Sequence, residues 1–113
     1  MSTRLPGAKY KCIFDRGRSV KGRLLVAWHL SSPDADQQAG VVVSKKSFHD
    51  AVDRNRAKRL MREAFRLNRD RIVSGVEVVL IARGFMNGKS MQDVAGDIRY
   101  LFRKSGIEAP REE

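Results

Sequence analysis

The chain has 113 residues, a formal net charge of +10 and a pI near 10.5. Its length predicts a single domain, residues 1–113, that buries roughly two-thirds of its unfolded surface. The excess of basic residues favours a polyanionic partner. No apolar run approaches the roughly 18 residues of a membrane-spanning helix, so a membrane partner is not expected.

Cys12 is the only cysteine, so no internal disulfide can form. No charged-then-apolar signal segment opens the sequence, and we expect the protein to stay in a reducing cytoplasm. Cys12 itself is interpreted as a small buried hydrophobe on a short helix.

The first half of the chain predicts one helix followed by strands. Residues 8–16 have apolar side chains at helical spacing, and Gly17 ends that helix. A short strand over 19–21, a longer one over 24–30 and a β-branched run over 41–43 follow, with a polar loop over 34–38. We expect residues 1–6 and 108–113 to be flexible.

The second half predicts helix, strand, helix. The central helix starts near Asp50, which can serve as N-cap with Asp53 in a capping-box arrangement, and runs to about Asn68. A buried strand over 76–82 and a loop lead to a last helix that Ser90 caps and Gly106 ends. The predicted fold class is therefore α/β (α+β), with helices packed on a small mixed sheet.

The stretch from residue 45 to 71 has a local net charge of +6. On a helix, residues 57, 60, 61, 64 and 65 form an apolar stripe, and basic residues occupy the other sides. Such faces are often merely solvated, but here Arg62 has no acid three or four positions away, whereas a face selected for solubility would mix the signs. We therefore interpret this stretch as a nucleic-acid-binding surface, and its candidate contact residues are Lys45, Lys46, Arg54, Asn55, Arg56, Lys58, Arg59, Arg62 and Arg66.

The sequence contains no recognisable catalytic motif. No carboxylate pair, metal-ligand spacing, nucleophile motif or phosphate-binding glycine loop emerges, so we predict no catalytic residue and no metal site. If the protein belongs to an enzyme, another molecule should supply the catalytic groups. The rings of Tyr10, Phe14 and Trp28 could stack on unpaired bases, although their spacing fits core packing equally well.

Two other functions remain open at this point. A structural ribosomal protein or general RNA-binding module would have a similar composition. A DNA-binding helix in the major groove is the third candidate, but no dimerisation element or helix-turn-helix spacing accompanies it.

A family resemblance narrows the choice. Ser44-Lys45-Lys46, followed by the run from Arg54 to Phe65 (RNRAKRLMREAF), resembles the protein subunit of bacterial ribonuclease P. The resemblance extends over most of the chain, including Leu5-Pro6, Phe14 with Gly17, Ile81-Ala82-Arg83 and Leu101-Phe102-Arg103-Lys104.

The resemblance implies a two-layer sandwich like domain 2 of ribosomal protein S5, with a left-handed βαβ crossover against the general right-handed rule. It also implies a ribonucleoprotein endonuclease that removes the 5′ leader from precursor tRNA. The partners would be ribonuclease P RNA and precursor tRNA. Mg²⁺ held by the RNA would do the chemistry, and the protein alone would be a monomer.

Residue roles follow from the same resemblance. Arg54, Asn55, Arg56, Lys58, Arg59 and Arg62 would contact RNA. A cleft between the first helix, the sheet and the central helix would hold the single-stranded leader against Tyr10, Phe14 and Trp28. Trp28 replaces a more usual tyrosine or phenylalanine, which keeps a stacking surface but changes its size. Residues 47–50 lack the glycine that many relatives have there, so the resemblance does not predict the backbone path of that loop.

Overall fold

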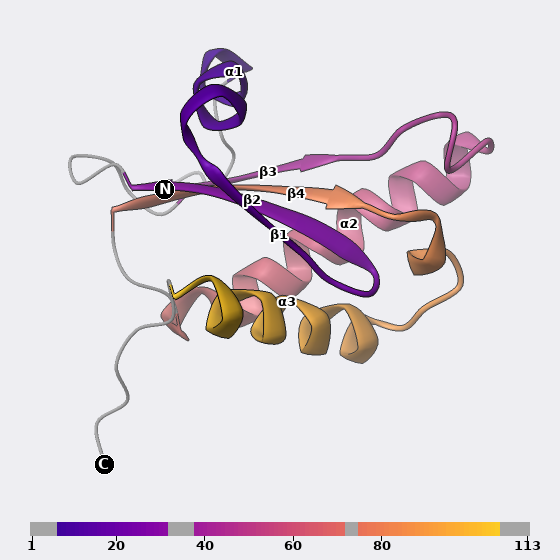
Figure 1. Cartoon of the computed structure of the whole chain (residues 1–113). Helices are drawn as coiled ribbons and strands as arrows, with labels where there is room; N and C mark the ends of the chain where they lie inside the picture. The colour runs from indigo at the N-terminus through magenta and orange to yellow at the C-terminus, as the bar shows by residue number, and fades with distance from the viewer. Residues whose placement is uncertain (1–6, 32–37, 72–74, 107–113) are drawn as a thin grey trace.

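The computed structural model describes residues 7–31, 38–71 and 75–106, and its elements follow the predicted order (Figure 1). The flexible ends and most of the polar loop predicted from the sequence lie outside these residues. The elements are α1 (Gly7–Arg16), β1 (Arg18–Lys21), β2 (Leu25–Ser31), β3 (Gln38–Val42), α2 (Ala51–Asn68), β4 (Val76–Ala82) and α3 (Met91–Ser105), with short 3₁₀ turns η1 (Arg69–Arg71) and η2 (Gly84–Met86).

The four strands form a mixed sheet in the order β1-β2-β4-β3. Strand β2 runs antiparallel to both neighbours, and β3 runs parallel to β4. Parallel neighbours need a crossover connection, and α2 lies in it. The left-handed sense of that crossover stays an expectation from the resemblance.

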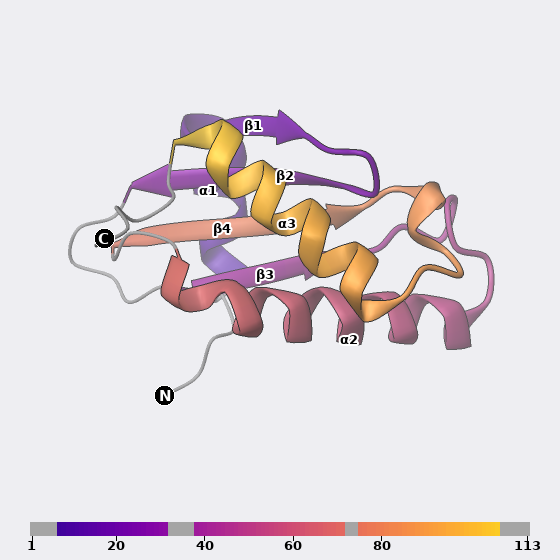
Figure 2. The same ribbon diagram turned by 90° about the horizontal axis from the view of Figure 1, so that it is seen from below.

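Helices α2 and α3 cover one face of the sheet, and α1 lies on the other (Figures 1 and 2). The larger core fills the space under α2 and α3, where the rings of Phe65 and Phe102 meet edge to face at 6.1 Å. Side chains of β4 alternate between the two sides, because Val78 and Leu80 join this core while Val79 packs towards α1. The predicted apolar stripe of the central helix is thus buried here.

The helix ends correct one prediction and confirm two. The capping box predicted at Asp50 is wrong, because its side chain makes no cap hydrogen bond. The chain entering α2 is held instead by the Arg54 guanidinium, which bonds to the two carbonyls just before the helix. Ser90 does form a capping box, and Gly106 ends α3 in the left-handed region at φ 81°.

Two smaller predictions also need correction. Gln38, expected in the loop, opens β3 by pairing with Glu77. Cys12, expected to be buried, is only half-buried on α1.

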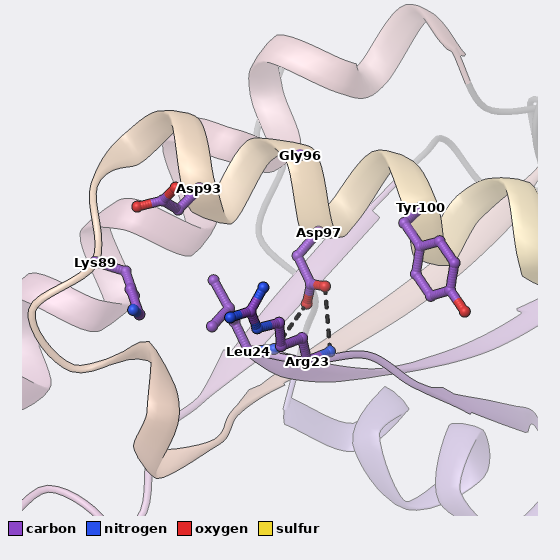
Figure 3. Close-up of a pocket in the computed structure, with 7 residues that line it drawn as sticks. All are labelled: Arg23, Leu24, Lys89, Asp93, Gly96, Asp97 and Tyr100. Carbon is purple, nitrogen blue, oxygen red and sulfur yellow. Dashed lines mark hydrogen bonds between the residues drawn. The ribbon is translucent and has the colours of Figure 1, made fainter.

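One carboxylate fixes the β1–β2 turn against α3. Asp97 accepts hydrogen bonds from the backbone N–H groups of Arg23 and Leu24 at 3.2 and 3.0 Å (Figure 3). It also accepts one from the backbone N–H of Leu25 at 3.2 Å. The fit is close at Gly22, where a Cβ would lie 2.6 Å from a carboxylate oxygen. A single side chain of α3 therefore satisfies three turn donors that the sheet leaves unpaired.

Replacing Asp97 with alanine should lower the free energy of unfolding by about 2–3 kcal/mol, because three partly buried donors lose a charged acceptor. Urea denaturation would measure the change. Gln92→Ala, at an exposed position of the same helix, is the control and should stay within about 0.5 kcal/mol of the wild type. Equal stability of the two variants would mean that other contacts hold the turn.

Candidate nucleic-acid interface

Helix α2 is buried on one side and cationic on the other. Met61, Ala64 and Phe65 are fully buried, while Arg59 and Arg62 are exposed. Neither arginine forms an ion pair or hydrogen bond with any residue in 7–31, 38–71 or 75–106. We call Arg59, Arg62 and Arg66 the arginine row. Its charges lie close together on a rigid helix, an arrangement that suits a run of phosphates.

Arg66 differs from its neighbours in the row because it is paired. Its Nε and Nη2 donate to the Glu63 carboxylate at 3.0 and 2.7 Å, one helical turn away. The hydrogen bond from Arg66 lowers the pKa of Glu63, and the same contact raises the pKa of Arg66. The pair is exposed to water, so phosphate can compete with Glu63 for this arginine.

Two of the predicted RNA-binding arginines have structural partners. Arg54 Nη1 donates to the carbonyls of Phe48 and His49 at 3.0 and 2.8 Å, and Arg56 Nη2 donates to the Lys89 carbonyl at 2.8 Å. Both side chains are half-buried, and each ties α2 to a loop. Their guanidinium groups are therefore less free to follow a ligand than those of Arg59 and Arg62.

The connection from β3 to α2 is also basic. Lys45 and Lys46 are exposed in it, and Asn55 is exposed one turn into the helix. Phe48 anchors the connection in the main core with only 2% of its surface exposed. No non-glycine residue in the described ranges has a positive φ, so this path needs no glycine at residues 47–50. The missing family glycine therefore causes no backbone strain.

The three aromatic candidates gather on the α1 face of the sheet. The rings of Phe14 and Trp28 meet edge to face at 5.4 Å, and Tyr10 packs with Trp28 against a small cluster around Ile13 and Val79. Phe14 keeps 38% of its surface exposed, and the other two rings are half-buried. They are neither fully core nor fully free, and we call them the ring surface.

Helices α1 and α2 lie on opposite faces of the sheet (Figure 1), and the ring surface packs on the α1 side. The expectation that α2 forms one wall of the aromatic cleft is therefore wrong. Alternation along the strands is the reason, because side chains that pack under α1 cannot also face α2. The basic connection that contains Lys45 and Lys46 leads from the sheet to the α2 layer.

The sequence did not lead us to predict a buried acid, Glu77, on the α1 side of the sheet. Glu77 is 2% exposed and forms an ion pair with Lys9 of α1 at 3.5 Å. Its Oε2, the oxygen that faces Lys9, has no hydrogen-bond partner among the described residues. The sequence does contain a signal for this pair, because Glu77 is the one acid in an otherwise apolar strand. A buried acid needs a partner, so a nearby cation could have been predicted. The pair links α1 to the start of strand β4.

Among residues 7–31, 38–71 and 75–106, no group of three or more His, Cys, Asp or Glu side chains is placed to hold a metal ion. In the same part of the chain, no helix is long and apolar enough to cross a membrane.

Fold and site together define a small α+β protein that presents an arginine row on a rigid helix, a feature of proteins that bind nucleic acid. The model of the Ribonuclease P family matches residues 5–106. The chain belongs to this family: it is the protein subunit of ribonuclease P, a ribonucleoprotein enzyme of tRNA processing.

Individual relatives agree with this assignment. The ribonuclease P protein components of Clostridium kluyveri and Gluconacetobacter diazotrophicus are each 37% identical over 102 residues, which is 88% of this chain and 90% and 87% of theirs. The ribonuclease P protein of Thermotoga maritima superposes with a TM-score of 0.76 at 28% identity, covering 88% of this chain and 96% of that one. The Staphylococcus aureus protein shares the fold, with a TM-score of 0.82 at 24% identity over 96% of this chain and all of that one.

The ring surface depends on a glycine in β3. A Cβ at Gly40 would overlap the phenol ring of Tyr10. Gly40→Ala should therefore displace that ring, shift the emission of Trp28, the only tryptophan, and cost about 1–3 kcal/mol of stability. Fluorescence-detected urea denaturation would measure both effects.

Gly84→Ala is the control, because a Cβ there meets nothing within 4 Å. Adding Tyr10→Ala to Gly40→Ala should recover part of the loss, because it removes the overlapping ring. If Gly40→Ala matched Gly84→Ala in both stability and emission, Tyr10 would not be held against β3.

Proposed function

We propose that this protein binds ribonuclease P RNA through the outer side of α2 and the 5′ leader of precursor tRNA on the ring surface, and thereby assists removal of the leader. The observation that supports the first contact is the arginine row, in which Arg59 and Arg62 lack partners among residues 7–31, 38–71 and 75–106. Unpaired cations on a helix whose other side is buried favour contacts with phosphates. Such contacts position an RNA without reading its sequence.

The ring surface supports the second contact. Its rings are partly exposed and already packed, so stacking on them costs little side-chain entropy. Unpaired bases can stack on aromatic rings, whereas bases within a duplex cannot reach them, and this favours a single-stranded leader over paired RNA.

The two contacts would be joined around the edge of the sheet. Because α2 and the ring surface lie on opposite faces, we infer that RNA touching both passes along the β3–α2 connection, in which Lys45 and Lys46 are exposed. These lysines would neutralise the phosphates between the two surfaces. Mg²⁺ held by the RNA subunit would supply the chemistry of cleavage, while this chain contributes positive charge and stacking surface.

Binding to ribonuclease P RNA should fall on the order of a hundredfold between 50 and 200 mM salt, if about five phosphates are contacted. Arg59→Ala combined with Arg62→Ala should weaken binding at every salt concentration and reduce the slope of log K against log salt by about 2, one for each lost contact. Filter binding across a salt series would measure both quantities.

A matched control removes two exposed cations from the other helix of the same layer, Arg99 and Lys104 of α3. The net charge falls equally in both double variants, so a general charge effect would lower the two slopes alike. Such an equal fall would contradict a specific role for the arginine row.

Reconstitution with ribonuclease P RNA at low Mg²⁺ tests the function itself. The wild-type protein should accelerate 5′ cleavage of a precursor tRNA, and an RNA whose activity is unchanged by the protein would overturn the proposal. Phe14→Ala should weaken binding of leader-containing precursor by roughly tenfold through loss of one stacking ring. It should leave leaderless tRNA unaffected, and Phe14→Tyr should behave as wild type.

A further inference from the structure

A second basic and aromatic surface lies at the end of the molecule where the β1–β2 turn meets the loop before α3. A hollow of about 440 Å³ there is lined by Arg23, Leu24, Arg83, Phe85 and Lys89, and we call it the Phe85 hollow. A neighbouring hollow of about 300 Å³ shares Arg23, Leu24 and Lys89 and extends towards Tyr100 (Figure 3). None of the shared residues belongs to the arginine row or the ring surface.

The Phe85 side chain lies on the surface and is not part of the core. It is 66% exposed, and the Arg83 guanidinium carbon lies 5.3 Å from its ring centroid. Arg83 is itself fixed, because its Nη1 donates to the Gly22 carbonyl at 2.8 Å. A ring supported by an immobilised cation, with much of its surface open to water, is suited to stacking on a flat, electron-rich partner.

The charged residues that line the Phe85 hollow are basic. They are Arg23, Arg83 and Lys89, and none of the described residues that line it is an acid. Asp93 and Asp97 line only the neighbouring hollow, and their carboxylates already accept backbone hydrogen bonds, from Ser90 and from the β1–β2 turn respectively. The hollow therefore combines a stacking surface with cations for phosphate.

The hollow is also connected to the helix that we propose as the RNA-binding element. Arg56 of α2 donates to the Lys89 carbonyl at 2.8 Å, which places the loop before α3 against the first half of α2. An RNA that lies along α2 could thus continue into the hollow without leaving basic surface.

We propose that the Phe85 hollow binds unpaired RNA, with one base stacked on Phe85 and the flanking phosphates held by Arg23 and Lys89. The inference rests on the proposed function, since it adds a third contact to the same protein–RNA assembly. The unpaired nucleotides could come from ribonuclease P RNA or from the precursor, because the recognised chemistry is the same.

The test compares Phe85→Leu, which keeps an apolar side chain, with Phe85→Trp, which keeps a ring. The full chain is titrated with ribonuclease P RNA, and the reconstituted holoenzyme is titrated with precursor tRNA with and without its leader. Phe85→Leu should weaken one of these interactions by roughly tenfold, whereas Phe85→Trp should retain wild-type affinity. Loss in the first titration assigns the base to ribonuclease P RNA, and loss only in the second assigns it to the precursor.

Leu67→Ala is the control for loss of an exposed apolar side chain, since Leu67 is 60% exposed on α2. Thermal unfolding of each variant checks the fold. Wild-type affinity of Phe85→Leu in every titration, or equal losses in Phe85→Leu and Phe85→Trp, would overturn the inference. The second result would indicate shape-specific packing, as in a protein–protein contact.

The arginine-row variant distinguishes this inference from the proposed function. If Arg59→Ala with Arg62→Ala weakens RNA binding while Phe85→Leu does not, the α2 interface stands and the hollow fails. If only Phe85→Leu weakens binding, the hollow stands and the α2 interface fails.

Discussion

The protein depends on the burial of one side of α2. Met61, Ala64 and Phe65 are removed from water between the sheet and α3, and each large apolar side chain buried in this way contributes on the order of 2 kcal/mol. This packing fixes the rotation of the helix about its axis. Arg59 and Arg62 consequently face water, where the repulsion between nearby cations is tolerated because the opposite side of the helix is held in the core.

The same packing explains why the basic residues differ in freedom. Arg54 and Arg56 lie on the flanks of α2, within reach of neighbouring loops, and their guanidinium groups bond to loop carbonyls. Arg59 and Arg62, on the outer side of the helix, make no such bond with the residues that the structure describes. The helix thus contains two kinds of arginine. Some hold neighbouring loops in place, and others point outwards with N–H groups that can bind a ligand. A family motif read from sequence does not separate these two kinds.

The sheet separates the molecule into two surfaces with different chemistry. Under α2 and α3 lies the large apolar core, while the α1 side holds a smaller cluster with partly exposed rings and the buried Glu77–Lys9 pair. Alternation along the strands separates the two clusters, and burial of one side of α2 turns its arginines outwards. The basic β3–α2 connection and the loop before α3 extend the positive surface beyond the helix itself.

Local patterns were enough to predict the order of elements, the apolar stripe of α2 and the cap of α3, because periodicity and capping depend on neighbours within one or two turns. The family motif was enough to indicate the function. The capping box at Asp50 was a local prediction that failed, because Arg54 bonds to the two carbonyls just before the helix instead. Tertiary structure decided the rest: that the rings and α2 lie on opposite faces, and that Arg23 and Phe85 share a hollow. These facts depend on how strands pair and which segments meet across the sheet, and contacts between residues distant in sequence leave no periodic signal along the chain.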